Sequence, residues 1–136
     1  MGAGSFVIST GASADLITVL GSSTADELVI LADAGDNTIS AISNTSGFEI
    51  TAGSGADTIT IGSNLDASYA SHIDAGSGAN KISTGAGDFW VTVGSGNDEI
   101  TLNSAAGSDL KVIDFGGVNT IRAFRWYERN YAILPS

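Results

Sequence analysis

One short stretch decides the fold: residues 75–83 read AGSGANKIS. The same pattern, spaced glycines followed by an Asx residue (Asp or Asn) and an aliphatic residue, recurs at 52–60 (AGSGADTIT) and 93–101 (VGSGNDEIT). Weaker copies begin at residues 10, 34 and 116. The Asx residues of the six copies, which lie 22, 20, 23, 18 and 21 residues apart, are Asp15, Asn37, Asp57, Asn80, Asp98 and Asn119. A period near twenty residues is typical of a solenoid, in which each repeat forms one coil.

A second, looser series of apolar segments lies between these copies. Its members are Phe6-Val7-Ile8, Asp26-Glu27-Leu28, Phe48-Glu49-Ile50, Ser71-His72-Ile73, Phe89-Trp90-Val91, Leu110-Lys111-Val112 and Tyr131-Ala132-Ile133. Each coil therefore has a glycine turn, a strand, a freer turn and a second strand. Stacked coils of this kind predict an all-β, right-handed parallel β-solenoid, similar to a β-roll, with about six coils and two facing sheets.

Period-two alternation predicts which side chains point into the core. In the first sheet the expected inward pairs are Ile17/Val19, Ile39/Ala41, Ile59/Ile61, Ile82/Thr84, Ile100/Leu102 and Ile121/Ala123. The expected outward row is Thr18, Ser40, Thr60, Ser83, Thr101 and Arg122. In the second sheet, the residues that we expect to thicken the core are Phe6, Phe48, Phe89 and Leu110.

Length and charge limit the function. A chain of 136 residues is one domain at most, with solenoid repeats over residues 1–121 and a C-terminal cap or docking segment over 122–136. Residues 1–110 carry 13 acidic residues and one base, a net charge of −12, whereas residues 111–136 carry four bases and two acids, a net charge of +2. Such an acidic body argues against nucleic-acid partners. No twenty-residue apolar stretch exists, so we expect no membrane insertion, and the N-terminus has no secretory signal pattern.

The glycine-Asx pattern resembles the Gly-Gly-x-Gly-x-Asp nonapeptide of RTX-type calcium β-rolls over most of the chain. The resemblance implies Ca²⁺ between successive turns, held by backbone carbonyls and by Asp15, Asp57 and Asp98, with Asn37, Asn80 and Asn119 completing the ladder. Unlike the family, this chain alternates aspartate and asparagine, and the second side has no matching aspartates. The alternative is an Asx ladder that caps the turns by hydrogen bonds alone.

The C-terminal segment differs from the body in composition. Five of the ten aromatic residues lie after residue 114, and arginines accompany them. Aromatic residues and arginine dominate interface energetics, so the expected partner-binding residues are Arg122, Arg125, Trp126, Tyr127, Arg129 and Tyr131. The same segment could instead cap the open end of the solenoid, and both roles are compatible. The N-terminal coil has no comparable cap.

The single histidine and the outward hydroxyl row bear on catalysis, zinc binding and surface adhesion. His72 is the only histidine and is expected on the outer surface, so neither a hydrolytic triad nor a multi-histidine zinc site is indicated. The outward hydroxyl row is similar to the surfaces of ice- or surface-adhesion solenoids, but Lys81 and Glu99 interrupt the neighbouring column.

The sequence thus predicts a non-enzymatic structural protein of a virion or cell surface, extracellular in location. Its partner would be a protein of a larger assembly or a second copy of the chain. The alternative is a secreted calcium-binding module, and a second alternative is an ice- or surface-adhesion protein.

Overall fold

The structure is a computed structural model that describes residues 6–20, 27–42, 47–64, 70–105, 107–124 and 131–134, with only the backbone described for the last range. Within these ranges the chain forms thirteen strands and no helix, and therefore no helix suited to crossing a membrane. The strands are β1 (Phe6–Ser9), β2 (Leu16–Val19), β3 (Leu28–Leu31), β4 (Thr38–Ala41), β5 (Phe48–Thr51), β6 (Thr58–Ile61), β7 (Ser71–Asp74), β8 (Lys81–Thr84), β9 (Phe89–Val93), β10 (Glu99–Asn103), β11 (Leu110–Asp114), β12 (Thr120–Phe124) and β13 (Tyr131–Leu134).

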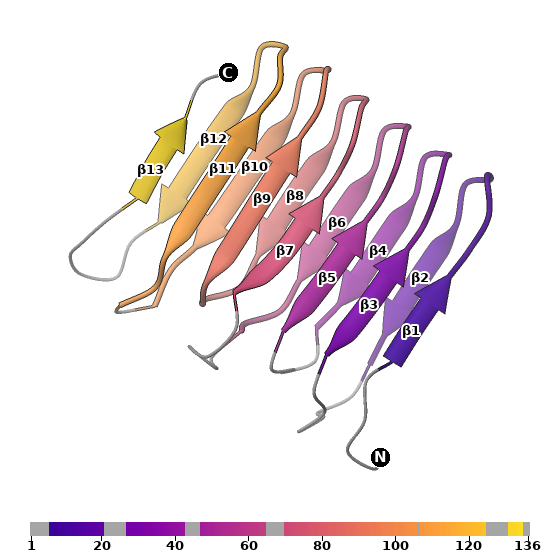
Figure 1. The fold of residues 1–136 in the computed structure, drawn as a ribbon, viewed down its shortest axis with the longest axis horizontal. Coiled ribbons are helices and arrows are strands. Elements are labelled where there is room, and N and C mark those ends of the chain that lie inside the picture. The colour runs from indigo at the N-terminus through magenta and orange to yellow at the C-terminus, as the bar shows by residue number, and fades with distance from the viewer. Residues whose placement is uncertain are drawn as a thin grey trace.

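The strands build two parallel sheets that face each other. Odd-numbered strands form one sheet in the order β1-β3-β5-β7-β9-β11-β13, and even-numbered strands form the other in the order β12-β10-β8-β6-β4-β2. In Figure 1 the chain rises through the front sheet, crosses over the glycine turns at the top and descends through the rear sheet while it advances to the left. That path is a right-handed coil. The predicted right-handed parallel β-solenoid is confirmed.

The core lies between the two sheets and consists of columns of aliphatic side chains that stack from coil to coil. The isoleucine two residues after each Asx pairs with its counterpart one coil on, so that Ile39, Ile59, Ile82 and Ile100 form one continuous buried column. Burial of a side chain of this size contributes about 1.5–3 kcal/mol. The columns of the other sheet include Phe48 and Phe89, as predicted, which are fully buried.

Three sequence-based expectations are wrong in detail. Phe6 pairs with Leu28, not with Asp26, so the third strand is the aliphatic run Leu28–Leu31 and the acidic pair before it does not belong to the strand. A four-residue aliphatic run has no alternation to fix its register, and the sequence alignment therefore slipped by two residues. Phe6 itself is 42% exposed, because β1 is the edge strand of its sheet among the described residues. Ala123, at the other end, is also exposed.

Candidate functional site in the glycine turns

The glycine turns connect the two sheets on one side of the solenoid, and successive turns are in close backbone contact. Gly78 has φ +120°, and a Cβ at this position would lie 1.8 Å from the carbonyl oxygen of Gly55 in the preceding coil. Glycine is therefore required both for its conformation and for the approach of the next turn. This close stacking brings the Asx residues of neighbouring coils within hydrogen-bonding distance.

The Asx residues form an unbroken ladder of hydrogen bonds between coils. The backbone N–H of each Asx residue donates to the side-chain Oδ1 of the Asx residue one coil later. The five steps are Asp15 to Asn37 (3.0 Å), Asn37 to Asp57 (2.8 Å), Asp57 to Asn80 (3.0 Å), Asn80 to Asp98 (2.8 Å) and Asp98 to Asn119 (2.6 Å). All six residues predicted as metal ligands thus lie in one row.

The asparagines use their second side-chain atom to close the turn. Nδ2 of Asn80 donates to the carbonyl oxygens of Gly76 (3.3 Å) and Gly78 (3.2 Å). Asn37 donates in the same way to Gly35, at 3.0 Å, and Asn119 to Gly116, at 3.4 Å. An amide therefore satisfies both the ladder and the carbonyls of its own turn.

The aspartates leave one oxygen unpaired. Oδ2 of Asp15, Asp57 and Asp98 is buried and has no hydrogen-bond partner. Asp57 and Asp98 are only 1% and 2% exposed. Burial is the main cause that raises the pKa of Asp57 and of Asp98, partly offset by hydrogen bonds from Asn37 and Asn80 respectively. The carboxyl groups thus occupy a site that disfavours their charged form.

Two species can satisfy such an oxygen. A proton on Oδ2 would turn the acid into a hydrogen-bond donor with the shape of the asparagine amide. A hard cation such as Ca²⁺ would instead recruit the carboxylate oxygen and turn carbonyls, but it prefers six to eight oxygen ligands. Among the described residues, no three Asp, Glu or His side chains converge on one point. Because aspartate and asparagine alternate along the ladder, each pair of neighbouring coils supplies one ladder carboxylate.

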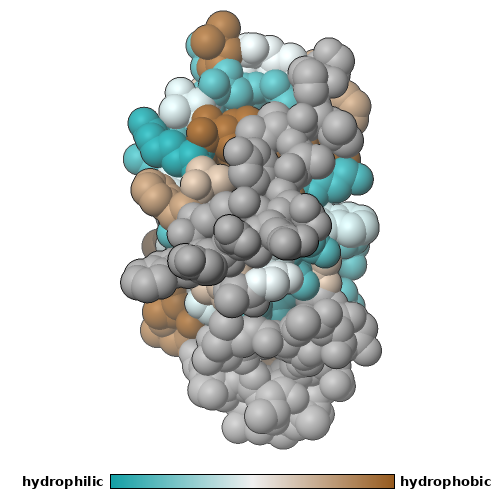
Figure 2. All heavy atoms as spheres, turned by 90° about the vertical axis from the view of Figure 1, so that its left-hand side faces the viewer, coloured by the Kyte–Doolittle hydropathy of each residue, from teal (hydrophilic) through white to brown (hydrophobic). Residues whose placement is uncertain are grey.

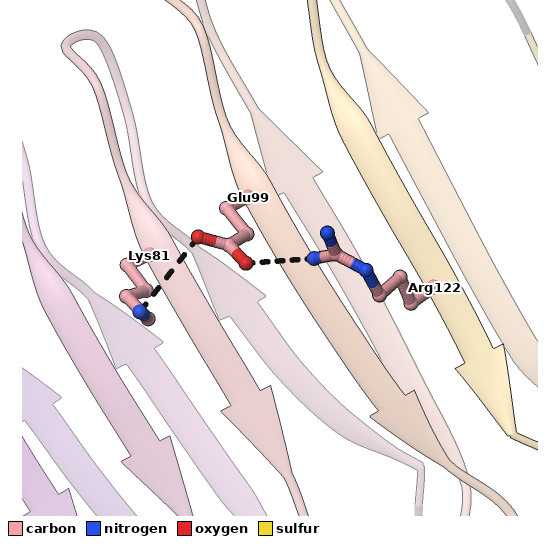
Figure 3. A network of polar contacts seen from close by, with 3 residues as sticks. All are labelled: Lys81, Glu99 and Arg122. Carbon is pink, nitrogen blue, oxygen red and sulfur yellow. Dashed lines mark hydrogen bonds and ion pairs between the residues drawn. The ribbon is translucent and has the colours of Figure 1, made fainter.

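The basic residue at the start of the predicted docking segment has a local partner. Arg122 lies in β12, and its Nη1 donates to Oε1 of Glu99 at 2.7 Å, while Nζ of Lys81 lies 3.7 Å from Oε2 of the same residue (Figure 3). The hydrogen bond from Arg122 is the main cause that lowers the pKa of Glu99. These three side chains cross three neighbouring strands on the outer face of the even-numbered sheet, beside the hydroxyl row.

The structure describes little of the remaining predicted docking residues. Arg125, Trp126, Tyr127 and Arg129 lie outside the described residues, and only the backbone of Tyr131, the first residue of β13, is described. Figure 2 looks onto this end of the solenoid and shows brown apolar patches beside polar ones. The exposed apolar residues of the last described coil are Phe115, Val118 and Phe124.

A surface row that the sequence analysis missed lies on the outer face of the odd-numbered sheet. The His72 ring stacks on the Trp90 ring with centroids 4.9 Å apart and planes 12° from parallel, and Nζ of Lys111 lies 5.0 Å from the Trp90 centroid. The register pairs these three positions across β7, β9 and β11. The predicted outward position of His72 is confirmed.

No family model matches the sequence, and no curated protein or solved structure matches it.

Proposed function

We propose that the chain is a non-enzymatic structural component of a virion or cell-surface assembly, in which a rigid acidic solenoid is held by its basic, aromatic C-terminal end. The observation that carries this proposal is the continuous strand register from β1 to β13, which makes one stiff body of uniform cross-section. Side-chain columns that interlock over the whole length resist bending, because interiors are close-packed.

The distribution of charge supports attachment by one end. The net charge is −12 over residues 1–110 and +2 over residues 111–136, so the two parts attract different surfaces. Exposed Phe115, Val118 and Phe124 add apolar area at the same end. Apolar and aromatic groups beside arginine are typical of the centres of protein interfaces.

Fractionation of native particles tests this proposal. The chain is expressed in its native source, and the share that sediments with high-mass particles is compared between wild type and an Arg125→Ala, Trp126→Ala double variant. We expect the wild type in the particle fractions and the variant among free protein, with β-rich circular dichroism unchanged. A matched Lys81→Ala variant, which removes a basic residue that lies outside the C-terminal segment and is engaged with Glu99, should remain with the particles. A wild-type chain found only as free protein would overturn the proposal.

The unpaired aspartate oxygens favour a second candidate function, a secreted calcium-binding module. If Ca²⁺ completes the turns, its binding free energy becomes folding free energy. Thermal melts in millimolar calcium and in excess chelator test this directly. A melting temperature that does not differ between the two conditions would eliminate this function.

A further inference from the structure

The N-terminal end of the solenoid is formed by two uncharged edge strands. Among the described strands, β1 and β2 lie at the edges of the two sheets. Their sequences, FVIS and LITV, contain no charged residue, proline or glycine. Exposed edges are normally protected by charge, proline or a bulge, because their free backbone groups recruit further strands. At the opposite end, β12 carries Arg122.

The outer faces of these strands are also apolar. Val7, the second residue of β1, is 66% exposed, and Leu16, the first residue of β2, is 76% exposed. The equivalent positions two coils further on are the polar residues Glu49 and Thr58. Along the column of Val7 the residue one coil on, Val29, is still apolar and the polar residue follows at Glu49, whereas Leu16 is followed directly by Thr38.

The direction of the edge hydrogen-bonding groups follows from the pairing of β1 and β2 with the next coil. The amides of Phe6 and Thr10 donate to Glu27 and Leu31, so those of Val7 and Ser9 point away from β3. In the second strand, the carbonyl oxygen of Asp15 accepts from Thr38, on the side of β4. By the same alternation, the backbone groups of Leu16 and Thr18 face the open edge. Within the described ranges, each edge thus presents two residues whose N–H and C=O groups have no backbone partner.

A second copy of the chain fits this end without a gap. A two-fold axis parallel to the strands exchanges the two sheets, so that β1 of each copy meets β2 of the other in antiparallel orientation and both sheets continue. Head-to-tail stacking does not fit as well. The described strands number seven in one sheet and six in the other, and contact between β13 and the next β1 would leave one strand position vacant beside β12. Closed two-fold dimers are also the commonest assembly.

We propose that the chain forms a two-fold dimer through its N-terminal coil, with β1 and β2 of each copy pairing with β2 and β1 of the other. In the register with full overlap, the edge-facing residues Val7 and Ser9 lie opposite Thr18 and Leu16 of the second copy. The inward residues Phe6 and Ile8 then lie opposite Val19 and Ile17. In this one register, the edge-facing backbone groups of the two copies lie opposite each other, and so do their inward apolar side chains.

Size and charge are compatible with this interface. A coil of roughly twenty residues at about 3.3 Å per residue has an end face of roughly 20 by 25 Å, side chains included. Two such faces bury on the order of 1,000 Å² together, which is the lower limit of specific interfaces. The acidic bodies repel each other, whereas β1 and β2 carry no charged residue and add no repulsion of their own at this interface.

Proline substitution at the edge tests the dimer. Val7→Pro removes an edge-facing N–H that has no partner among the residues that the structure describes, so the monomer should keep its fold. Ala123→Pro is the matched control, because Thr120 donates to Asp98 and Phe124 accepts from Ser104, which leaves Ala123 facing the open edge at the other end. We expect sedimentation equilibrium to give twice the chain mass for wild type and Ala123→Pro. For Val7→Pro we expect a dissociation constant raised on the order of 30-fold or more.

Engineered cysteines test the register. The chain has no cysteine of its own, so Ser9→Cys with Leu16→Cys reports only the new pair. Within one copy these residues point to opposite faces, whereas across the two-fold axis they lie opposite each other. We expect a disulfide-linked dimer on oxidation, and much less of it for Ser9→Cys with Thr18→Cys. A monomeric wild type, or a Val7→Pro dimer as stable as wild type, would overturn the inference. Neither result bears on the C-terminal attachment, which the particle experiment tests separately.

Discussion

The backbone N–H of Asp57 donates to Oδ1 of Asn80, 3.0 Å away and 23 residues later in the chain. One coil earlier, the N–H of Asn37 donates to Oδ1 of Asp57 at 2.8 Å. Aspartate and asparagine therefore play the same part in the ladder through Oδ1. They differ only in the second atom, which is a satisfied Nδ2 in asparagine and an unpaired Oδ2 in aspartate.

Asp57→Asn should therefore stabilise the protein in the absence of metal. The new Nδ2 can donate to the turn carbonyls as that of Asn80 does, and a buried unpaired oxygen disappears. We expect a gain of about 1 kcal/mol in the free energy of unfolding, measured by denaturant titration at pH 7 in excess chelator.

Asn80→Asp provides the opposite substitution in the same ladder. It would remove the donations to Gly76 and Gly78 and place three carboxyl groups in succession, so we expect it to destabilise. If Asp57→Asn lowered the stability in chelator, the ladder of hydrogen bonds would not be what holds the turns. A loss seen only in the presence of calcium would instead identify Oδ2 as a metal ligand.

The raised pKa values of Asp57 and Asp98 predict that acid stabilises the turns. Because the folded-state pKa of each lies above the ordinary value of 3.8, the folded state binds protons more tightly than the unfolded chain. Their contribution to stability is full below pH 3.8 and is lost as the pH rises through the folded-state pKa. We expect the melting temperature to rise as the pH falls from 7 towards 4.

General relief of repulsion in an acidic protein would also raise stability in acid, so a control is needed. The Asp57→Asn, Asp98→Asn double variant should show a smaller rise than wild type, whereas Asp109→Asn, at an exposed position, should retain the full rise. Equal pH profiles for wild type and the double variant would contradict the assignment to these two groups.

The repeat made the fold predictable because it fixes the same inward position in every coil. An isoleucine or its equivalent follows each Asx residue by two positions, and the strands align on it. The one register error, at Leu28, occurred in the run Leu28–Leu31, where the outward residues Val29 and Leu31 are aliphatic like the inward ones. Alternation carries no information in such a run, and only pairing with the adjacent strands decides it.

The residues of the candidate site could be predicted from the sequence, but the hydrogen bonds between them could not. The six Asx residues are recognisable in the sequence, yet the direction of their hydrogen bonds, from one coil to the next, depends on the close approach of successive turns. The row of His72, Trp90 and Lys111 could have been found, since all three are the central residues of aligned apolar segments.

Gly78→Ala should prevent the turns from stacking. A Cβ at this position would lie 1.8 Å from the Gly55 carbonyl oxygen, and φ is +120°. The backbone of a stacked coil cannot move away without a large cost in free energy. We therefore expect the free energy of unfolding to fall by more than about 3 kcal/mol, or the variant not to fold. Gly107→Ala is the matched control, since φ there is +85° but nothing lies within 4 Å. Its cost should be about 1 kcal/mol, and equal losses in the two variants would refute the importance of turn-to-turn contact.

Ile59→Asp and Thr60→Asp should separate the two faces of β6. Ile59 is fully buried between Ile39 and Ile82 of the neighbouring strands, whereas Thr60 is exposed between Ser40 and Ser83. A carboxylate at residue 59 has no partner in the aliphatic column, and its cost of several kcal/mol is a large part of the stability of a domain of this size. The same charge at residue 60 stays hydrated and should cost less than about 1 kcal/mol. Circular dichroism melts of the two variants test this. If Ile59→Asp unfolded cooperatively at a melting temperature close to that of Thr60→Asp, the core could not be built on this column.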